Sequence, residues 1–262
     1  MRVFDFTHAI VREPGLSVVD GLRTTPSAPS YDGVMAEHRA YIAALRAAGL
    51  TVDVLPPLEE FPDSVFVEDP VFVVPEGAIL LRPGAPSRLG EREAMRDAIA
   101  KHFGHVPELQ EGELVDGGDV LITPRTIFIG LSKRTNRAGA EALRDRLREI
   151  GRDARVVATP EGVLHFKTAS SLLDENTILA TRAMADSGVF EGFEVLLTPE
   201  CEEGAANALR VNEVVFVGDC YPKTIEMIRK TGLTVIPLAI TEVAKLDAGL
   251  SCMSLRWRKK AL

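Results

Sequence analysis

The chain has 262 residues, of which 46% are hydrophobic and 26% are charged, as in an ordinary soluble globular protein. This length suffices for one domain with a real core, and we expect a single domain over residues 1–262. The net charge of −8 argues against a nucleic-acid partner, because binding to phosphates needs a basic face.

Neither the apolar segments nor the cysteines indicate a membrane or secreted protein. No apolar run approaches the ~18 residues of a membrane span, and the first residues lack the apolar core of a signal peptide. The three cysteines are widely spaced and form neither a disulfide framework nor a zinc-ligand pattern. We therefore expect a cytoplasmic protein, where a free thiol persists. The sequence does not distinguish a monomer from a homodimer.

Strand and helix signals recur in one order along the chain. Each unit has two short apolar strands, an amphipathic helix and a further strand. In chain order we expect strands at 9–12 and 51–55 around a helix at 31–48; strands at 71–74 and 78–81, a helix at 89–103 and an extended piece near 106; strands at 120–123 and 126–129, a helix at 136–150 and a strand at 155–158; strands at 168–173 and 177–180, a weaker helix and a strand at 193–197; and strands at 208–211 and 214–217, a helix opened by Pro222 and a strand at 234–238.

The two ends of the chain complete the pattern. Residues 253–257 are expected to pair with 9–12, which gives about five strand-strand-helix-strand units at a spacing of roughly 40–50 residues. Each unit alone would expose an apolar face, and a closed ring would bury all of these faces. The pattern therefore predicts an α/β ring, with an open α/β sandwich as the alternative.

An acidic cluster at residues 61–70 is the first candidate site. Asp63, Glu68 and Asp69 lie in a run whose apolar residues indicate a buried strand. Buried carboxylates are costly unless something positive meets them, and a guanidinium matches carboxylates through flat, paired hydrogen bonds. The alternative reading is loop charges, which fits Asp63 better than Asp69.

Three further residues, each from a different unit, suggest covalent chemistry. Cys252 is a candidate nucleophile and His165 a candidate general acid and base. Asp116, just before a glycine pair, would hold the histidine in the right orientation. Each has a structural alternative: a buried core cysteine, a packed histidine and a simple tight turn. A ring would bring the three together at its centre.

Two arginines are candidates for binding a substrate carboxylate. Arg88 and Arg134 each stand just before an expected helix. A guanidinium binds a carboxylate through two parallel hydrogen bonds, although either residue alone also fits an ordinary surface arginine.

At these residues the chain resembles the dimethylarginine dimethylaminohydrolases. This family belongs to the guanidino-group-modifying superfamily, whose fold is a five-bladed α/β propeller of ββαβ units with pseudo-five-fold symmetry around a central active-site channel. The matching stretches cover nearly the whole length in the right order: residues 19–22, 61–70, 82–88, 114–120, 130–136, 164–167, 205–207 and 250–252.

The resemblance implies a hydrolase that converts asymmetric dimethylarginine or monomethylarginine to citrulline and an alkylamine. Cys252 would attack the central guanidinium carbon and form a covalent thiouronium-like intermediate. His165 would help to activate the thiol, protonate the departing amine and then activate water, while Asp116 orients it. No metal and no organic cofactor is implied.

The resemblance also implies how the small cationic substrate is held. Asp69, with Glu68, would bind the guanidinium. Asp63 and the backbone carbonyl of Leu22 would bind the α-amino group. The α-carboxylate would meet the two arginines, Arg88 and Arg134. The loop at residues 15–30 lies beside Leu22, and we expect it to close over the substrate.

Two rival functions remain at this stage. One is an enzyme of the same superfamily that acts on another guanidino amino acid, such as arginine or a hydroxylated arginine. Substrates without a carboxylate fit less well, because Arg88 and Arg134 would have no partner. The other is a non-catalytic propeller that serves as a binding protein, like a ribosome anti-association factor, which would not need Cys252, His165 and Asp116.

Overall fold

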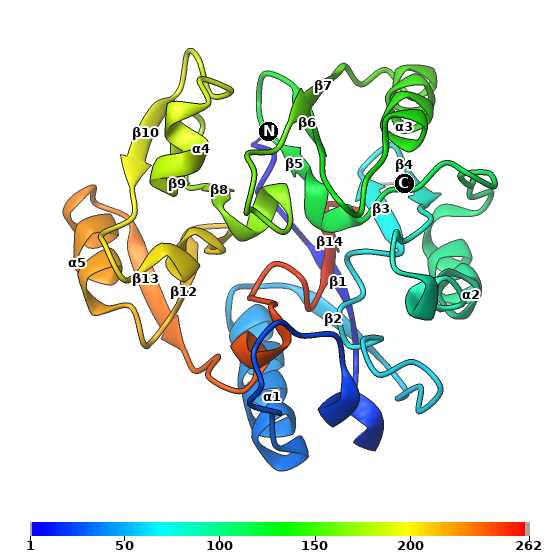
Figure 1. Ribbon diagram of the computed structural model, residues 1–262, viewed down its shortest axis with the longest axis horizontal. Helices are drawn as coiled ribbons and strands as arrows, with labels where there is room; N and C mark the ends of the chain where they lie inside the picture. The colour runs from blue at the N-terminus through cyan, green and yellow to red at the C-terminus, as the bar shows by residue number, and fades with distance from the viewer. Residues whose placement is uncertain (1, 260–262) are drawn as a thin grey trace.

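The computed structural model describes residues 2–259 of the chain. Five small sheets surround a common axis, with the strands toward the centre and the α-helices at the periphery (Figure 1). This is a five-bladed α/β propeller, which confirms the expected ring and rejects the open sandwich. None of the helices among residues 2–259 combines the length and apolarity needed to cross a membrane.

Four of the five blades have an antiparallel strand pair, a helix and a third strand that lies parallel to the second. The helices begin and end within a few residues of the expected positions. The elements are β1 (His8–Arg12), α1 (Tyr31–Ala47) and β2 (Thr51–Leu55); β3 (Val71–Val74), β4 (Gly77–Leu80) and α2 (Glu91–Phe103); β5 (Val120–Ile122), β6 (Ile127–Leu131), α3 (Arg137–Glu149) and β7 (Ala154–Ala158); β8 (Ser170–Leu172), β9 (Thr177–Ala180), α4 (Arg182–Asp186) and β10 (Glu194–Leu197); β11 (Leu209–Val211), β12 (Val214–Gly218), α5 (Pro222–Lys230) and β13 (Thr234–Leu238); and β14 (Leu255–Trp257).

The first and last strands close the ring. β14 pairs antiparallel with β1, so that Leu255 lies opposite Ile10, and β1 pairs in parallel with β2. The two ends of the chain therefore complete one blade, as the sequence pattern predicts.

The second blade departs from the pattern, because the extended piece near Val106 does not form a full strand. It contributes one isolated bridge, between Leu80 and Glu108. Pro107 has no N–H to donate, and only its carbonyl takes part, accepting from the Leu80 amide at 2.9 Å. This sheet therefore has two strands.

Apolar clusters between each sheet and its helix hold the blades together. In the third blade, Leu143 and Leu147 of α3 pack on Val120 and Ile129, and all four side chains are at most 2% exposed. Burying one such side chain contributes about 1.5–3 kcal/mol. The helix begins where the Asn136 side chain accepts the Gly139 amide at 2.8 Å, a cap that contributes about 1 kcal/mol.

The acidic segment at residues 61–70 is buried, but the expectation of a strand there is wrong. The Ser64 amide donates to the Phe61 carbonyl at 3.0 Å and the Phe66 amide to the Asp63 carbonyl at 2.9 Å. These bonds span three residues and make consecutive turns. The segment therefore presents its carboxylates in several directions instead of on two alternating faces.

Candidate active site

One polar residue precedes the innermost strand of every blade. Asp69 lies before β3, Asp116 before β5, His165 before β8, Asn207 before β11 and Cys252 before β14. All five are buried, with exposed fractions of 1–9%. Because the innermost strands converge on the axis, five residues that are far apart in the sequence meet near its centre.

A cavity of about 140 Å³ lies at this place. It brings together eight of the nine candidate residues, all except Glu68. The lining consists of these eight and of neighbouring loop residues: Leu22, Asp63, Asp69, Arg88, Asp116, Arg134, His165 and Cys252, with Arg23, Thr24, Phe66, Leu164, Leu246, Asp247 and Ala248.

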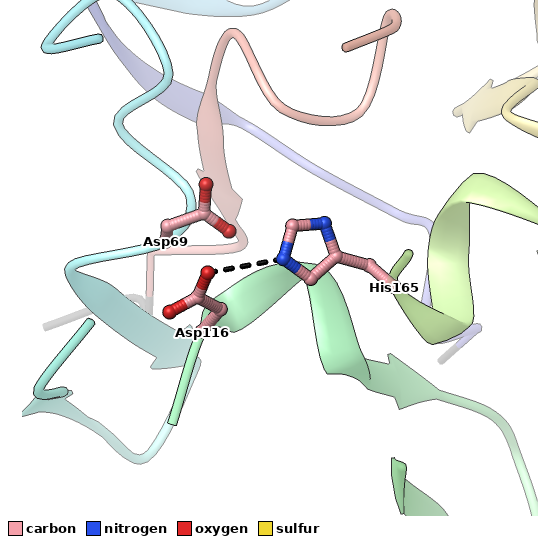
Figure 2. A group of neighbouring side chains, drawn as sticks. All are labelled: Asp69, Asp116 and His165. Atoms are coloured by element: carbon pink, nitrogen blue, oxygen red, sulfur yellow. Dashed lines mark hydrogen bonds and ion pairs between the residues drawn. The ribbon is translucent and has the colours of Figure 1, made fainter. Parts of the chain in front are cut away.

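His165 and Asp116 form a direct pair. The His165 Nε2 atom lies 3.0 Å from the Asp116 Oδ2 atom (Figure 2), and the second oxygen of Asp116 accepts the Gly84 amide at 2.6 Å. Burial lowers the pKa of His165, but the hydrogen bond to Asp116 and the charges of Asp69 and Asp119 outweigh it. The pKa of His165 rises to about 9, so the ring carries two protons at neutral pH.

Asp119 is a second buried carboxylate behind this pair. Its Oδ2 atom accepts from the hydroxyls of Ser132 and Thr135, each at 2.6 Å, and its Oδ1 atom accepts the Phe166 amide at 2.9 Å. It thus ties the turn that carries His165 to the neighbouring blade. Asp119 directly follows the glycine pair in the sequence, where no pattern indicated this role.

Asp69 lies beside Asp116 and His165 in the same cluster (Figure 2). Its Oδ1 atom accepts the Gly118 amide at 2.9 Å, and its Oδ2 atom pairs with Arg88. Burial opposes ionisation of Asp69, but the positive charges of Arg88 and His165 outweigh it, and the pKa lies below its ordinary value. The site therefore presents an ionised carboxylate at neutral pH.

Arg88 lines the cavity, but most of its donors are already engaged. Its Nε and Nη2 atoms meet the two carboxylate oxygens of Glu91 at 2.9 and 2.7 Å. Nη1 pairs with Asp69, and Nη2 also donates to the carbonyls of Phe66 and Asp63. In this structure Arg88 thus binds Glu91 and the acidic segment, and its expected contact with an α-carboxylate stays a prediction.

Arg134, Asp63 and Leu22 also line the cavity. Among residues 2–259, the Arg134 guanidinium has neither a hydrogen-bond nor an ion-pair partner, so its donors are available. The Leu22 amide donates to the Asp63 carboxylate at 3.0 Å, which ties the loop to the acidic segment. Burial raises the pKa of Asp63, and the charge of Arg88 only partly offsets it.

Glu68 does not line this cavity, and its expected contact with the guanidinium stays a prediction. Its carboxylate pairs with Lys167 at 2.7 Å and with Arg256 at 3.0 Å. All three side chains line a second cavity of about 120 Å³, formed largely by the innermost strands. The two cavities share no lining residue, and Glu68 and Asp69 point to different ones.

Cys252 sits in a tight turn before β14. Its amide donates to the Gly249 carbonyl at 3.3 Å, and Arg256 donates to the carbonyls of Ser251 and Ser254 at 3.0 and 2.6 Å. Burial and the negative charges of Glu68 and Asp69 raise the pKa of Cys252 to about 11. The resting thiol is therefore protonated at neutral pH.

Asp69, Asp116 and His165 offer ligand atoms within 4.8 Å of one another, a spacing that suits a metal ion. Each of these groups is already engaged: His165 with Asp116, and Asp69 with Arg88 and the Gly118 amide. The arrangement suits proton transfer and cation binding.

Comparison with known proteins identifies the family. The family model described as N,N dimethylarginine dimethylhydrolase, eukaryotic, matches residues 28–161. The N(G),N(G)-dimethylarginine dimethylaminohydrolase of Pseudomonas aeruginosa is 40% identical over 254 residues, which cover 96% of this chain and 100% of that protein. The chain belongs to the dimethylarginine dimethylaminohydrolase family. The enzyme of the same name from Streptomyces coelicolor is 36% identical, over 96% of this chain and 97% of that one.

Solved structures of this family superpose closely on the chain. The P. aeruginosa enzyme, as a cysteine-to-serine mutant complexed with citrulline, matches with a TM-score of 0.94, 40% identity and coverage of 97% of this chain and 100% of that one. A histidine-to-glycine variant of a dimethylarginine dimethylaminohydrolase, as an adduct with S-methyl-L-thiocitrulline, gives a TM-score of 0.92 at 40% identity, over 96% of this chain and 99% of that one.

Three further polar residues of this family member were missed by the sequence reasoning. Asn207, Lys167 and Arg256 each lie in a stretch that precedes or forms an innermost strand. A signal was available for Asn207, because it lies a few residues before the first strand of its unit, as Asp116 and Cys252 do.

Proposed function

We propose that this protein hydrolyses asymmetric dimethylarginine and monomethylarginine to citrulline and an alkylamine. The observation that carries the proposal is one cavity that holds a thiol, a paired histidine and an ionised carboxylate: Cys252, His165 with Asp116, and Asp69. This set provides a nucleophile, a proton donor and a partner for a cation.

The cavity has matching groups for each end of such a substrate. The guanidinium lies against Asp69, and the α-amino group meets Asp63 and the carbonyl of Leu22. The α-carboxylate binds chiefly to Arg134, whose donors are available, with Arg88 adding its remaining Nη1 hydrogen. The citrulline complex of the P. aeruginosa enzyme supports an amino-acid ligand of this size.

In the first half of the reaction, the Cys252 thiol loses its proton to solvent as the guanidinium arrives. The thiolate then attacks the central carbon and forms a C–S bond. His165, protonated in the resting site, gives its proton to the substituted nitrogen, and the C–N bond breaks. The alkylamine leaves, and a thiouronium remains on the sulfur while Asp116 holds the neutral imidazole.

In the second half, His165 takes a proton from water, and the hydroxide adds to the thiouronium carbon. The C–S bond then breaks and the carbonyl of citrulline forms. The proton of the added hydroxyl returns to the sulfur, so Cys252 and His165 regain their starting states. The reaction consumes one water molecule, and it involves neither electron transfer nor a cofactor.

The working form is a single catalytic domain, present as a monomer or a homodimer, because one chain supplies every group named above. We place it in the cytoplasm, where a reducing environment keeps Cys201, Cys220 and Cys252 as the free thiols seen here.

The test is citrulline release from asymmetric dimethylarginine, with monomethylarginine and arginine in parallel. We expect turnover of the methylated substrates and its loss in Cys252→Ser, with Cys220→Ser, an exposed cysteine, as the matched control. Turnover that survives Cys252→Ser would contradict the mechanism. Turnover of arginine alone would move the assignment to another guanidino amino acid of the same superfamily.

A further inference from the structure

Four blades contribute their pre-strand residue to the site described above, and the fifth blade contributes Asn207. This residue ends a short 3₁₀ segment, Glu203–Ala206, two positions before β11. Its side chain is buried, with an exposed fraction of 8%. It does not line the substrate cavity, so it reaches the site from behind the nucleophile.

The Asn207 amide bridges the backbone and the sulfur of the nucleophile turn. Its Oδ1 atom accepts the Ser251 amide at 3.0 Å, and its Nδ2 atom lies 3.8 Å from the Cys252 sulfur, within the reach of a hydrogen bond to sulfur. The orientation of the amide follows from these partners, because a backbone N–H must meet the oxygen. The NH₂ group therefore faces Sγ.

The surroundings of Asn207 fix this orientation. A Cβ atom at Gly249 would come within 2.6 Å of the Asn207 Cγ atom, so the amide packs directly on the glycine backbone. The Cys252 amide also donates to the Gly249 carbonyl, at 3.3 Å. The amide and the turn thus hold each other, and the donor stays beside the sulfur.

We propose that Asn207 is a catalytic residue whose amide donates a hydrogen bond to the Cys252 thiolate. The proposal rests on the proposed function, in which this thiolate forms before attack and leaves again in the second half of the reaction. Glu68 and Asp69 oppose a negative sulfur, so a donor is needed on its protein side. An amide meets this need without a positive charge that would repel the cationic substrate.

The decisive variant is Asn207→Asp. It keeps the size of the side chain and an acceptor for Ser251, but it replaces the donor beside Cys252 with a carboxylate oxygen. The matched control is Asn212→Asp, because the Asn212 amide also accepts a backbone N–H, at 2.7 Å, and donates to a carbonyl, at 2.8 Å, away from the site.

The readouts are kcat and KM for asymmetric dimethylarginine, and the pH dependence of Cys252 alkylation by iodoacetamide. For Asn207→Asp we expect kcat to fall at least tenfold, and the alkylation profile to move up by about one pH unit, the equivalent of a tenfold loss of thiolate. KM should stay within about threefold, because Asn207 does not line the substrate cavity. Asn212→Asp should keep the parent's kinetics and profile.

The proposal would be overturned if Asn207→Asp folds and keeps the parent's kcat and alkylation profile. If Cys252→Ser is inactive in the same assays, the proposed function would still stand. Active Cys252→Ser would instead remove the proposed function, and this proposal with it. If Asn207→Asp does not fold, Asn207→Ser decides, since it removes the NH₂ group without adding a charge. A lower kcat and a raised profile then support the proposal, and unchanged values refute it.

Discussion

Replacing Asp116 with asparagine tests the electrostatics of the site through stability. The pKa of His165 rises from 6.5 to about 9, a difference of roughly 2.5 units, and at 1.36 kcal/mol each this corresponds to about 3 kcal/mol. Because the pKa of His165 is higher in the folded than in the unfolded protein, its contribution to stability is complete below pH 6.5, the unfolded value. The contribution is lost as the pH rises through 9, the folded value. The parent protein should therefore lose stability between these two limits.

Asp116→Asn removes the hydrogen-bonded charge but leaves Asp69 and Asp119 in place. A hydrogen bond to a charged partner contributes about 1.5–3 kcal/mol, so at least half of the pH-dependent loss should disappear. The assay is urea unfolding at pH 6.5, 7.5, 8.5 and 9.5, with the free energy of unfolding compared between variant and parent. The variant should also lose about 10²-fold or more in kcat, as expected for a disturbed general acid.

The control for this experiment is a pair of the same kind that is more open to solvent. The His102 Nε2 atom lies 2.8 Å from Asp53, whose side chain is 45% exposed. Because solvent screens such a pair, Asp53→Asn should change stability by less than about 1 kcal/mol at every pH. If folded Asp116→Asn keeps the parent's full loss of stability over this pH range, Asp116 does not control the charge of His165, and the assigned proton donor is wrong.

Three more substitutions probe other parts of the site. Arg134→Ala should raise KM about 10–100-fold with little change in kcat, because the substrate loses a charge-assisted hydrogen bond. The control is Arg137→Ala, at an exposed position, which should change neither KM nor kcat. A Cβ atom at position 117 would come 2.0 Å from the Glu68 carbonyl oxygen, so Gly117→Ala should destabilise the protein by about 1–3 kcal/mol in thermal unfolding. The control is Gly77→Ala, which has open space around the new methyl group and should keep the parent's stability. Arg256→Met removes one of the two cations that pair with the buried Glu68 carboxylate, and should lower the free energy of unfolding in urea by about 3–5 kcal/mol. A decrease under about 1 kcal/mol would show that Lys167 alone can stabilise the Glu68 charge.

The fold was predictable because its signals are local and repeated. Hydrophobic periodicity and turn residues placed the helices within a few residues, and the order of elements indicated the ring. Closure needed only one long-range pairing, between β14 and β1. The acidic segment was not predictable in this way, because its apolar residues match a buried strand while its backbone forms turns.

The sequence predicted which residues form the site better than it predicted which of them pair with one another. Glu68 and Asp69 are adjacent in sequence, and neighbouring residues of an extended segment point to opposite sides, so even a strand would have separated them. Arg88 and Glu91 are three residues apart at the start of a helix, a spacing that favours pairing. The partner of Arg88 was therefore visible in the sequence, whereas its contact with Asp69 depends on the tertiary fold.

The charges of the resting site explain why the thiol can remain protonated until substrate binds. Arg88 already neutralises Asp69, and protonated His165 is paired with Asp116. An arriving guanidinium adds a positive charge to this balanced set, and loss of a proton restores the balance. In the proposed mechanism, His165 keeps its proton because Asp116 stays bonded to it, so the proton comes from Cys252, the group that attacks as a thiolate. Asp69, one of the carboxylates that raise the pKa of the thiol in the free protein, would thus also attract the cation that ionises it.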